Sequence, residues 1–227
     1  MTVLYIDTEH DDVRADPDLG PRHQARIAAA CARLADAAGE PCLSRRAAEI
    51  SPESIDRLAP ASIVISGNTT DWCRFDDGHF AGLLQTIRVA PVPILGICAG
   101  HQLIGHAHGA PWGPIGPLHE DEIDPYPEFS PGQRKERGFL SIAIDPTSPL
   151  FRDLDSASVF FQSHYWHLER APDGFAVRAH SPWSPVQAIE RLDRPVFGVQ
   201  FHPERADAIH SHGSTVLRNF LSLQSSI

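Results

Sequence analysis

The stretch Pro93-Ile94-Leu95-Gly96-Ile97-Cys98-Ala99-Gly100-His101-Gln102 decides the fold of this chain. Its first half is a short apolar run typical of a buried strand, and its second half reads as the start of a helix. Cys98 stands at the junction in a Gly-x-Cys-x-Gly pattern. A side chain two positions before or after such a turn would collide with neighbouring backbone, so glycine is needed at both flanks. The pattern predicts a strand, a nucleophile elbow and a helix, with Cys98 at the turn.

The predicted elbow favours a reactive thiol. The first turn of a helix presents unpaired N–H groups and the positive end of the helix dipole, and both favour the thiolate. The alternative is an inert buried cysteine beside two incidental glycines, because free cysteine is among the most buried residue types. Glycine at both required positions favours the catalytic interpretation.

A second motif lies downstream, in Val196-Phe197-Gly198-Val199-Gln200-Phe201-His202-Pro203-Glu204. A thiol that attacks an amide needs a base to carry its proton, and the base needs a partner that fixes its tautomer. His202 and Glu204 fit these roles. Pro203, which lies between them, ends the strand and restricts the turn that separates the two side chains. Alone, the motif would more simply be a strand end with two solvated polar residues. Together with the elbow it predicts a triad of Cys98, His202 and Glu204.

The two motifs resemble those of the class I, triad-type glutamine amidotransferases, and the similarity runs from the strand Val3–Asp7 to the final helix. The resemblance implies a flavodoxin-like fold, with Cys98 as nucleophile, His202 as general base and acid, and Glu204 as its orienting partner. Members of this family hydrolyse the side-chain amide of glutamine through a γ-glutamyl thioester and pass ammonia to a synthetase.

Further site residues follow from the same resemblance. The segment 62–68 is similar to the strand whose end donates an oxyanion-hole N–H, which assigns that role to Gly67 or Asn68, together with the N–H of Ala99. Gln102 resembles a residue that contacts bound glutamine. The family strand usually ends in Gly-Gly-Pro, whereas this chain reads Ser66-Gly67-Asn68-Thr69-Thr70, so the loop must take a different path. Asparagine adopts unusual backbone angles better than most residues, which allows the amide donor to be retained.

A second departure concerns the segment 161–167, which resembles the family's Ser-His segment along the substrate. Ser163 and His164 match it, but Tyr165 and Trp166 replace the usual Gly-Asp or Gln-Asp. This aromatic pair leaves three functions open. The first choice is glutamine hydrolysis with ammonia transfer, and the second is hydrolysis of a γ-glutamyl conjugate with a larger leaving group. The third, a non-catalytic binding subunit with the same fold, is disfavoured by the intact triad.

Length and composition fit one enzyme domain over residues 1–227. A chain of 227 residues with 42% hydrophobic content can bury a single sizeable core, and it is too short to include a synthetase, so we expect any synthetase to be a separate protein. The net charge of −10 argues against binding to nucleic acid or anionic membranes. Without a long apolar run or a leader pattern, we expect a cytoplasmic protein.

Neither cofactor nor metal is expected. The four cysteines lack Cys-x-x-Cys spacing and are most simply free thiols in a reducing compartment. The 13 histidines form small clusters, but none is accompanied by a matching cysteine or carboxylate pattern, so we interpret them as polar surface or supporting residues. These clusters are His101, His106 and His108; His164 and His167; and His210 and His212.

Strands and helices alternate along the chain, which predicts an α/β fold with a mostly parallel sheet, flanking helices and a small antiparallel portion. Helices are expected from Gly20 to Gly39, around Phe80–Ile87, after the elbow, and around Val216–Leu221. The expected strands are Val3–Asp7, Ser62–Ser66, Ile94–Ile97, Phe139–Ile144, Val159–Phe161, Phe175–Ala179, Val186–Glu190 and Val196–Phe201. Ala110–Gln133, rich in Pro and Gly, should be a long surface loop.

Overall fold

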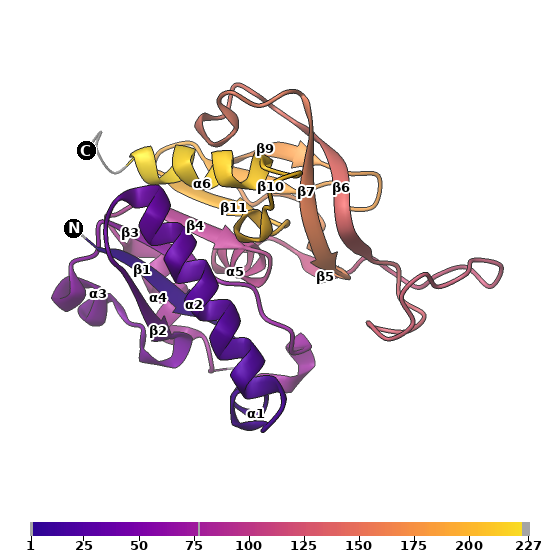
Figure 1. The fold of residues 1–227 in the computed structure, drawn as a ribbon, viewed down its shortest axis with the longest axis horizontal. Helices are drawn as coiled ribbons and strands as arrows, with labels where there is room; N and C mark the ends of the chain where they lie inside the picture. Colours follow the sequence, from indigo (N-terminus) through magenta and orange to yellow (C-terminus); the bar gives the residue numbers. More distant parts are fainter. Residues whose placement is uncertain (1, 77, 224–227) are drawn as a thin grey trace.

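A nine-stranded sheet forms the centre of the molecule in the computed structural model, which describes residues 2–76 and 78–223 (Figure 1). Its first five strands are mutually parallel: β2 (Cys42–Arg46), β1 (Val3–Asp7), β3 (Ser62–Ile65), β4 (Ile94–Ile97) and β11 (Val196–Val199). The other four continue the same sheet in antiparallel pairing: β10 (Ala188–Arg191), β9 (Phe175–His180), β6 (Glu136–Ile144) and β7 (Ala157–His164). The expected fold class is confirmed.

Helices cover both faces of the parallel part. Alternate residues of β1 point to opposite faces, so Val3 packs with α2 (Leu19–Ala38) and α6 (His212–Ser222), while Leu4 packs with the helices of the other face. Those helices are α3 (Pro52–Leu58), α4 (Ala81–Val89) and α5 (Ala99–Ala107). Strands buried on both sides read as continuous apolar runs, which is why the sequence pattern located them.

The parallel strands bring three segments of the predicted site to one edge. The carboxyl ends of β3, β4 and β11 lie side by side, and they lead into the Gly67 loop, the Cys98 elbow and His202. Ligands of open α/β sheets bind at this edge. The described residues also form four short 3₁₀ turns: Ala47–Glu49, Trp72–Arg74, Pro149–Phe151 and Pro203–Arg205.

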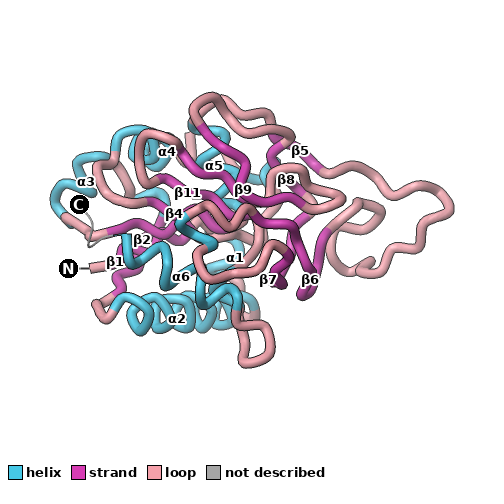
Figure 2. The backbone as a smooth tube through the Cα atoms, turned by 90° about the horizontal axis from the view of Figure 1, so that it is seen from above, coloured by secondary structure: helices cyan, strands magenta, loops and turns pink. Residues whose placement is uncertain are grey.

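Several elements differ from the sequence-based expectation. Ala110–Gln133 includes a short strand, β5 (Trp112–Pro114), which pairs with β8 (Trp166–Leu168) in a separate two-stranded sheet. The rest of that loop folds back on itself as an arm that projects from the body (Figures 1 and 2), with the Leu118 N–H donating to the Gly132 carbonyl at 3.0 Å. β7 is longer than predicted and includes Ser163 and His164. The sequence did not predict β2, α3 or α1 (Asp11–Ala15).

No helix in the described part of the chain is long and apolar enough to cross a membrane.

Candidate active site

Cys98 lies at a strained elbow between β4 and α5. Its backbone has φ 52° and ψ −104°, a region that residues with side chains rarely adopt. A Cβ added to Gly96 would lie 2.4 Å from the Gly100 carbonyl oxygen, and one added to Gly100 would lie 2.4 Å from that of Ile65. The predicted need for glycine at both flanks is confirmed.

His202 follows β11, and its N–H donates to the carbonyl of Phe161 on β7 at 2.8 Å. Its ring Nδ1 lies 2.7 Å from Glu204 Oε1, so Nε2 is the ring atom left for Cys98. Burial opposes a charge on this ring, but the Glu204 carboxylate and the Cys98 thiolate outweigh it and raise the pKa of His202 to about 10. The structure therefore brings the three predicted triad residues together.

The predicted oxyanion residues lie beside this group. A Cβ added to Gly67 would lie 2.9 Å from His202 Cε1 and 3.2 Å from Cys98 Cβ, so only glycine fits without displacing the triad. Ala99 is the first residue of α5, and its N–H consequently has no acceptor within the helix. Asn68 lines the cavity that also contains Cys98 and His202, which we call the catalytic cavity. Its buried side-chain Nδ2 has no hydrogen-bond partner among the described residues.

The loop after Gly67 is held by Glu9, a residue that the sequence did not single out. Its carboxylate is buried and accepts four hydrogen bonds from the loop, from the N–H and hydroxyl groups of Thr69 and Thr70, at 2.7 to 3.2 Å. The loop thus reaches a fixed path through one carboxylate where the similar pattern uses a proline.

Gln102 is buried on α5, and its side-chain amide is bonded within the protein. Its Oε1 accepts from Trp72 Nε1 at 2.8 Å, and its Nε2 donates to the Trp166 carbonyl and to Gln200 Oε1 at 2.9 and 3.0 Å. Gln102 also lines the catalytic cavity. Its contact with substrate stays a prediction; its contacts here position Gln200 and the Trp166 backbone.

Ser163 and His164 end β7 and line the same cavity; their contact with substrate stays a prediction. His164 is fully enclosed: Nδ1 lies 2.9 Å from the Trp166 carbonyl, and Nε2 lies 3.0 Å from the buried carboxylate of Glu136. Glu136 in turn accepts from Gln187 Nε2 at 2.6 Å. This buried network fixes the backbone that carries the aromatic pair.

Tyr165 and Trp166 both reach the catalytic cavity. The Tyr165 hydroxyl donates to the Asp71 carboxylate. Burial raises the pKa of Tyr165, and Asp71 adds to it, giving about 12, so the hydroxyl remains a donor at neutral pH. The Trp166 ring packs at 61° against Trp112 on β5, with 5.7 Å between ring centroids. The pair is anchored from both sides and forms a fixed wall.

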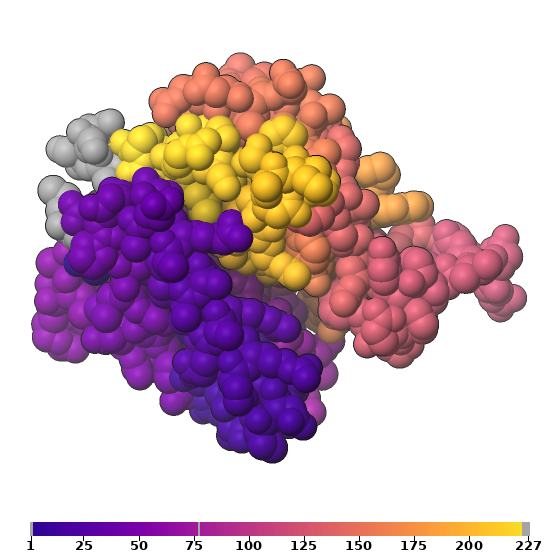
Figure 3. Space-filling view, viewed as in Figure 1, coloured from indigo at the N-terminus to yellow at the C-terminus, as the bar shows by residue number. Residues whose placement is uncertain are grey.

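The catalytic cavity has a volume of about 640 Å³ and lies between the carboxyl edge of the sheet, α2 and the strands β6 and β7. The space-filling view shows the surface hollowed between α2 and those strands (Figure 3). Pockets of this size hold drug-sized ligands. The cavity is therefore larger than one amino acid requires.

Similarity to known proteins agrees with this geometry. A family model described as "Glutamine amidotransferase class-I" matches residues 41–223. The glutamine-hydrolysing GMP synthase subunit of Pyrococcus abyssi is 32% identical over 171 residues, which cover 75% of this chain and 79% of that protein. The corresponding subunit of Thermococcus kodakarensis is 33% identical over 175 residues, with the same coverage. The chain belongs to the class I glutamine amidotransferases.

The fold agrees with this assignment. The crystal structure of a protein assigned as a GMP synthase subunit, from Thermoplasma acidophilum, superposes with a TM-score of 0.74 at 21% identity, covering 100% of this amidotransferase and 94% of that chain.

Gln200 is a site residue of this amidotransferase that the sequence did not assign. It is buried, and its Nε2 donates to Cys98 Sγ at 3.6 Å, while its Oε1 is held by Gln102. An amide donor to sulfur favours the thiolate. The signal was present in the sequence, because Gln200 precedes His202 by two residues, so that both lie at the same end of β11.

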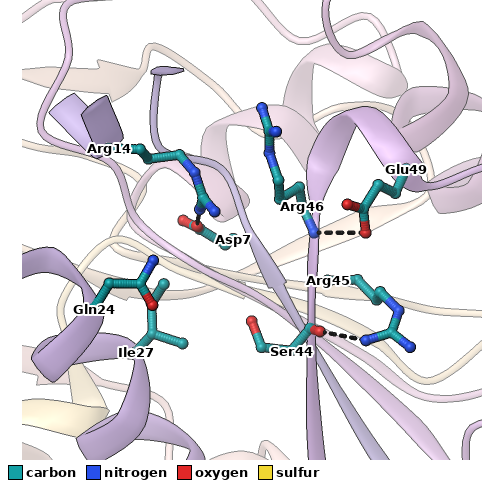
Figure 4. A pocket seen from close by; sticks show the side chains of 8 residues that line it. All are labelled: Asp7, Arg14, Gln24, Ile27, Ser44, Arg45, Arg46 and Glu49. Carbon is teal, nitrogen blue, oxygen red and sulfur yellow. Dashed lines mark hydrogen bonds and ion pairs between the residues drawn. The ribbon is translucent and has the colours of Figure 1, made fainter. Parts of the chain in front are cut away.

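A second, smaller cavity of about 410 Å³ lies beside β2 (Figure 4). In its wall Arg14 bonds to the buried Asp7, as the close-up shows. The other side of the Asp7 carboxylate faces His23 Nε2, at 3.0 Å, and His23 lines the catalytic cavity. Asp7 therefore contacts one residue that lines each cavity, Arg14 on one side and His23 on the other.

The histidine clusters have other partners. Among residues 2–76 and 78–223, no group of three His, Cys, Asp or Glu side chains is placed to hold a metal ion. Burial lowers the pKa of His101 to about 3, so its ring is neutral, and Nε2 lies 3.2 Å from the Val186 carbonyl. All four cysteines are free thiols.

Proposed function

We propose that this amidotransferase hydrolyses the side-chain amide of glutamine at Cys98 and supplies the ammonia to a separate synthetase subunit of the kind found in GMP synthase. The observation that carries the proposal is the close approach of the Gly67 backbone to both Cys98 and His202, where an added Cβ would lie within 3.2 Å of each, beside the 2.7 Å bond from His202 to Glu204. A nucleophile, a base with its orienting partner and an oxyanion loop thus meet at one point.

In the first step, the Cys98 thiolate attacks the amide carbon of glutamine. The oxyanion is stabilised by N–H groups of Ala99 and of Gly67 or Asn68, and donors of this kind are each worth about 3 kcal/mol of barrier in other enzymes. The C–N bond breaks as His202 gives its proton to the nitrogen, and ammonia leaves. Cys98 then carries the γ-glutamyl thioester.

The charges of the triad drive the proton transfer. The Cys98 thiolate is one of the groups that raise the pKa of His202, and it loses its charge when the thioester forms. The imidazolium becomes more acidic at the moment when the leaving nitrogen needs a proton. In the second step, neutral His202 takes a proton from water, the hydroxide attacks the thioester, and glutamate and the Cys98 thiolate are released.

The test measures glutamate and ammonia formed from glutamine by the wild type, Cys98→Ala and Cys98→Ser. We expect turnover in the wild type and none in either variant, with unchanged circular dichroism. Adding a GMP synthase-type synthetase with its nucleotide substrates should couple the ammonia to amination. Undiminished hydrolysis by either variant would remove Cys98 from the mechanism.

A further inference from the structure

Four arginines line the catalytic cavity, and one of them, Arg33, donates to the Ala206 carbonyl at 2.7 Å. The other three form a cluster. Arg26 comes from α2, Arg137 from β6, and Arg205 from the turn after His202. No hydrogen bond from these three side chains occurs in the described part of the chain, and their one ion pair there, from Arg137 to Glu128, is long at 3.9 Å. We call them the arginine cluster.

Two members of the arginine cluster are oriented by stacking. The guanidinium carbon of Arg205 lies 3.6 Å from the centroid of the Phe161 ring, and that of Arg137 lies 4.7 Å from the centroid of the Phe129 ring. A guanidinium whose face covers an aromatic ring keeps its N–H edge free, and that edge matches a carboxylate in a bidentate geometry.

The strand register explains why these groups converge. Arg137 is directly opposite Ser163 in the β6–β7 pair, so their side chains share one face of the sheet. Phe161, two residues before Ser163, lies on the same face and carries Arg205. The cluster therefore flanks the predicted substrate segment.

The positive charge of the cluster is not neutralised locally. Burial lowers the pKa of Arg205; Glu204 opposes this effect, and the charges of Arg26 and Arg137 add to it. The carboxylates that line the cavity have partners: Glu9 holds the threonine loop, Asp71 accepts from Tyr165, and Glu204 accepts from His202. Like charges gathered in this way, in a chain of net charge −10, favour an anionic ligand.

Glutamine is a poor match for a cavity that favours anions, because the charges of its ammonium and carboxylate groups cancel and leave it with no net charge. From the unpaired cluster and the volume of about 640 Å³, we infer that the amidotransferase also hydrolyses γ-glutamyl amides whose amine part carries a carboxylate, such as γ-glutamyl amino acids and peptides. The arginine cluster binds that carboxylate, and Tyr165 and Trp166 flank the amine part. The inference rests on the proposed nucleophile Cys98.

The reaction uses the same two steps. Cys98 sulfur bonds to the γ-carbonyl carbon, the C–N bond to the amine part breaks, and His202 protonates the departing nitrogen. Water then hydrolyses the thioester, so one γ-glutamyl amide and one water give glutamate and a free amino acid or peptide. No other reactant is needed.

The test compares three substrates: glutamine, γ-glutamylalanine and γ-glutamylalaninamide. The last two differ only at the alanine carboxyl group, which is a carboxylate in γ-glutamylalanine and a neutral amide in γ-glutamylalaninamide. We expect the wild type to prefer the carboxylate by about 10-fold or more in kcat/KM, as a charge-assisted bond implies. The double variant Arg26→Gln, Arg137→Gln leaves only Arg205 of the cluster and should lower that ratio severalfold toward one. Arg22→Gln, on the same helix but outside the cavity, should leave it unchanged.

Each outcome decides the inference. A wild-type ratio near one, no turnover of γ-glutamylalanine, or a ratio that survives the double variant would overturn it, whatever the rate with glutamine. Hydrolysis of γ-glutamylalanine with no turnover of glutamine would support it and overturn the proposed function instead. A preference that weakens as salt is added would support the electrostatic origin.

Discussion

Glu204→Gln separates the charge of the triad carboxylate from its shape. The Glu204 side chain is 14% exposed and that of His202 is 12% exposed, so their 2.7 Å contact is largely shielded from solvent. Glutamine keeps a carbonyl oxygen that can accept the Nδ1–H of His202, so the tautomer is preserved. The substitution removes one of the charges that raise the pKa of His202 to about 10.

The size of the effect follows from the bond that is weakened. Hydrogen bonds to charged groups contribute about 1.5–3 kcal/mol and neutral ones about 1 kcal/mol. A loss of roughly 1–2 kcal/mol corresponds to about a 10-fold lower kcat/KM for glutamine. His202→Ala removes the proton carrier and should cost at least about 100-fold, the low end for general acid–base catalysis.

The pH dependence should change in a defined direction. Activity that needs protonated His202 should fall in the wild type as pH approaches about 10, and in Glu204→Gln at lower pH. The raised pKa also stabilises the folded state. This contribution is fully present below the ordinary histidine value and is lost as pH rises through about 10, so the Tm difference between the two proteins should shrink over that window.

The assay is glutamate release over a range of pH, with Tm measured on the same samples. The reasoning is refuted if Glu204→Gln, properly folded, loses more activity than His202→Ala, or if its alkaline limb stays in place. Either result would reassign the base and its orienting partner.

Other perturbations test the neighbouring contacts. A diazo-ketone analogue of glutamine should label Cys98 alone, and mass spectrometry that finds label chiefly on another cysteine would contradict the assignment. Gln200→Leu removes the donor to sulfur and should lower kcat/KM for glutamine by about 10-fold while retaining the Tm within a few degrees; an unaffected rate would remove Gln200 from the site. Lys135→Met should speed amide exchange in the 124–135 turn and raise KM for γ-glutamylalanine, because this buried ammonium holds Asp124 and three carbonyls of the turn that carries Phe129; unchanged exchange would contradict that role. Trp166→Ala should change the kcat/KM ratio of glutamine to a bulky γ-glutamyl amide by about 10-fold, whereas a lowered Tm with an unchanged ratio would make the ring structural.

The sequence predicted the parts of the fold that local sterics and periodicity determine. The elbow was predictable because a Cβ added at either flanking glycine would lie 2.4 Å from a backbone carbonyl oxygen, so only glycine fits. The long helix α2 was predictable because its apolar face repeats at helical spacing and Gly39 ends it in the left-handed conformation, at φ 65°. Four of the five strands in the parallel part, β1, β3, β4 and β11, were predictable because they are buried on both faces.

The remainder depends on contacts between distant segments. β2 reads Cys-Leu-Ser-Arg-Arg and is half-buried throughout, so it shows neither an apolar run nor alternation and is a strand only because it pairs with β1. β5 forms because it meets β8, a strand far away along the chain. The local amino-acid pattern of a segment does not indicate pairings with strands that are distant in the sequence.

The same limit explains which candidate site residues the sequence could indicate. Cys98, His202 and Glu204 stand in two compact motifs, and each motif carries its own steric or chemical signature. Arg26, Arg137 and Arg205 come from three segments, and none of them differs locally from the solvated arginines elsewhere in the chain. Their meaning depends on a shared cavity and on acceptors missing among the described residues, which are properties of the fold.

The departure at Gly67-Asn68-Thr69 shows how the fold compensates for a change in sequence. A proline would restrict the oxyanion loop through its own ring. Here Thr69 and Thr70 leave the loop locally free, and four bonds to the buried Glu9 restrict it instead. Since Glu9 lies just after β1, the loop is anchored to the neighbouring parallel strand. The rigidity needed beside Cys98 therefore comes from a long-range contact, and the sequence of the loop alone could not reveal it.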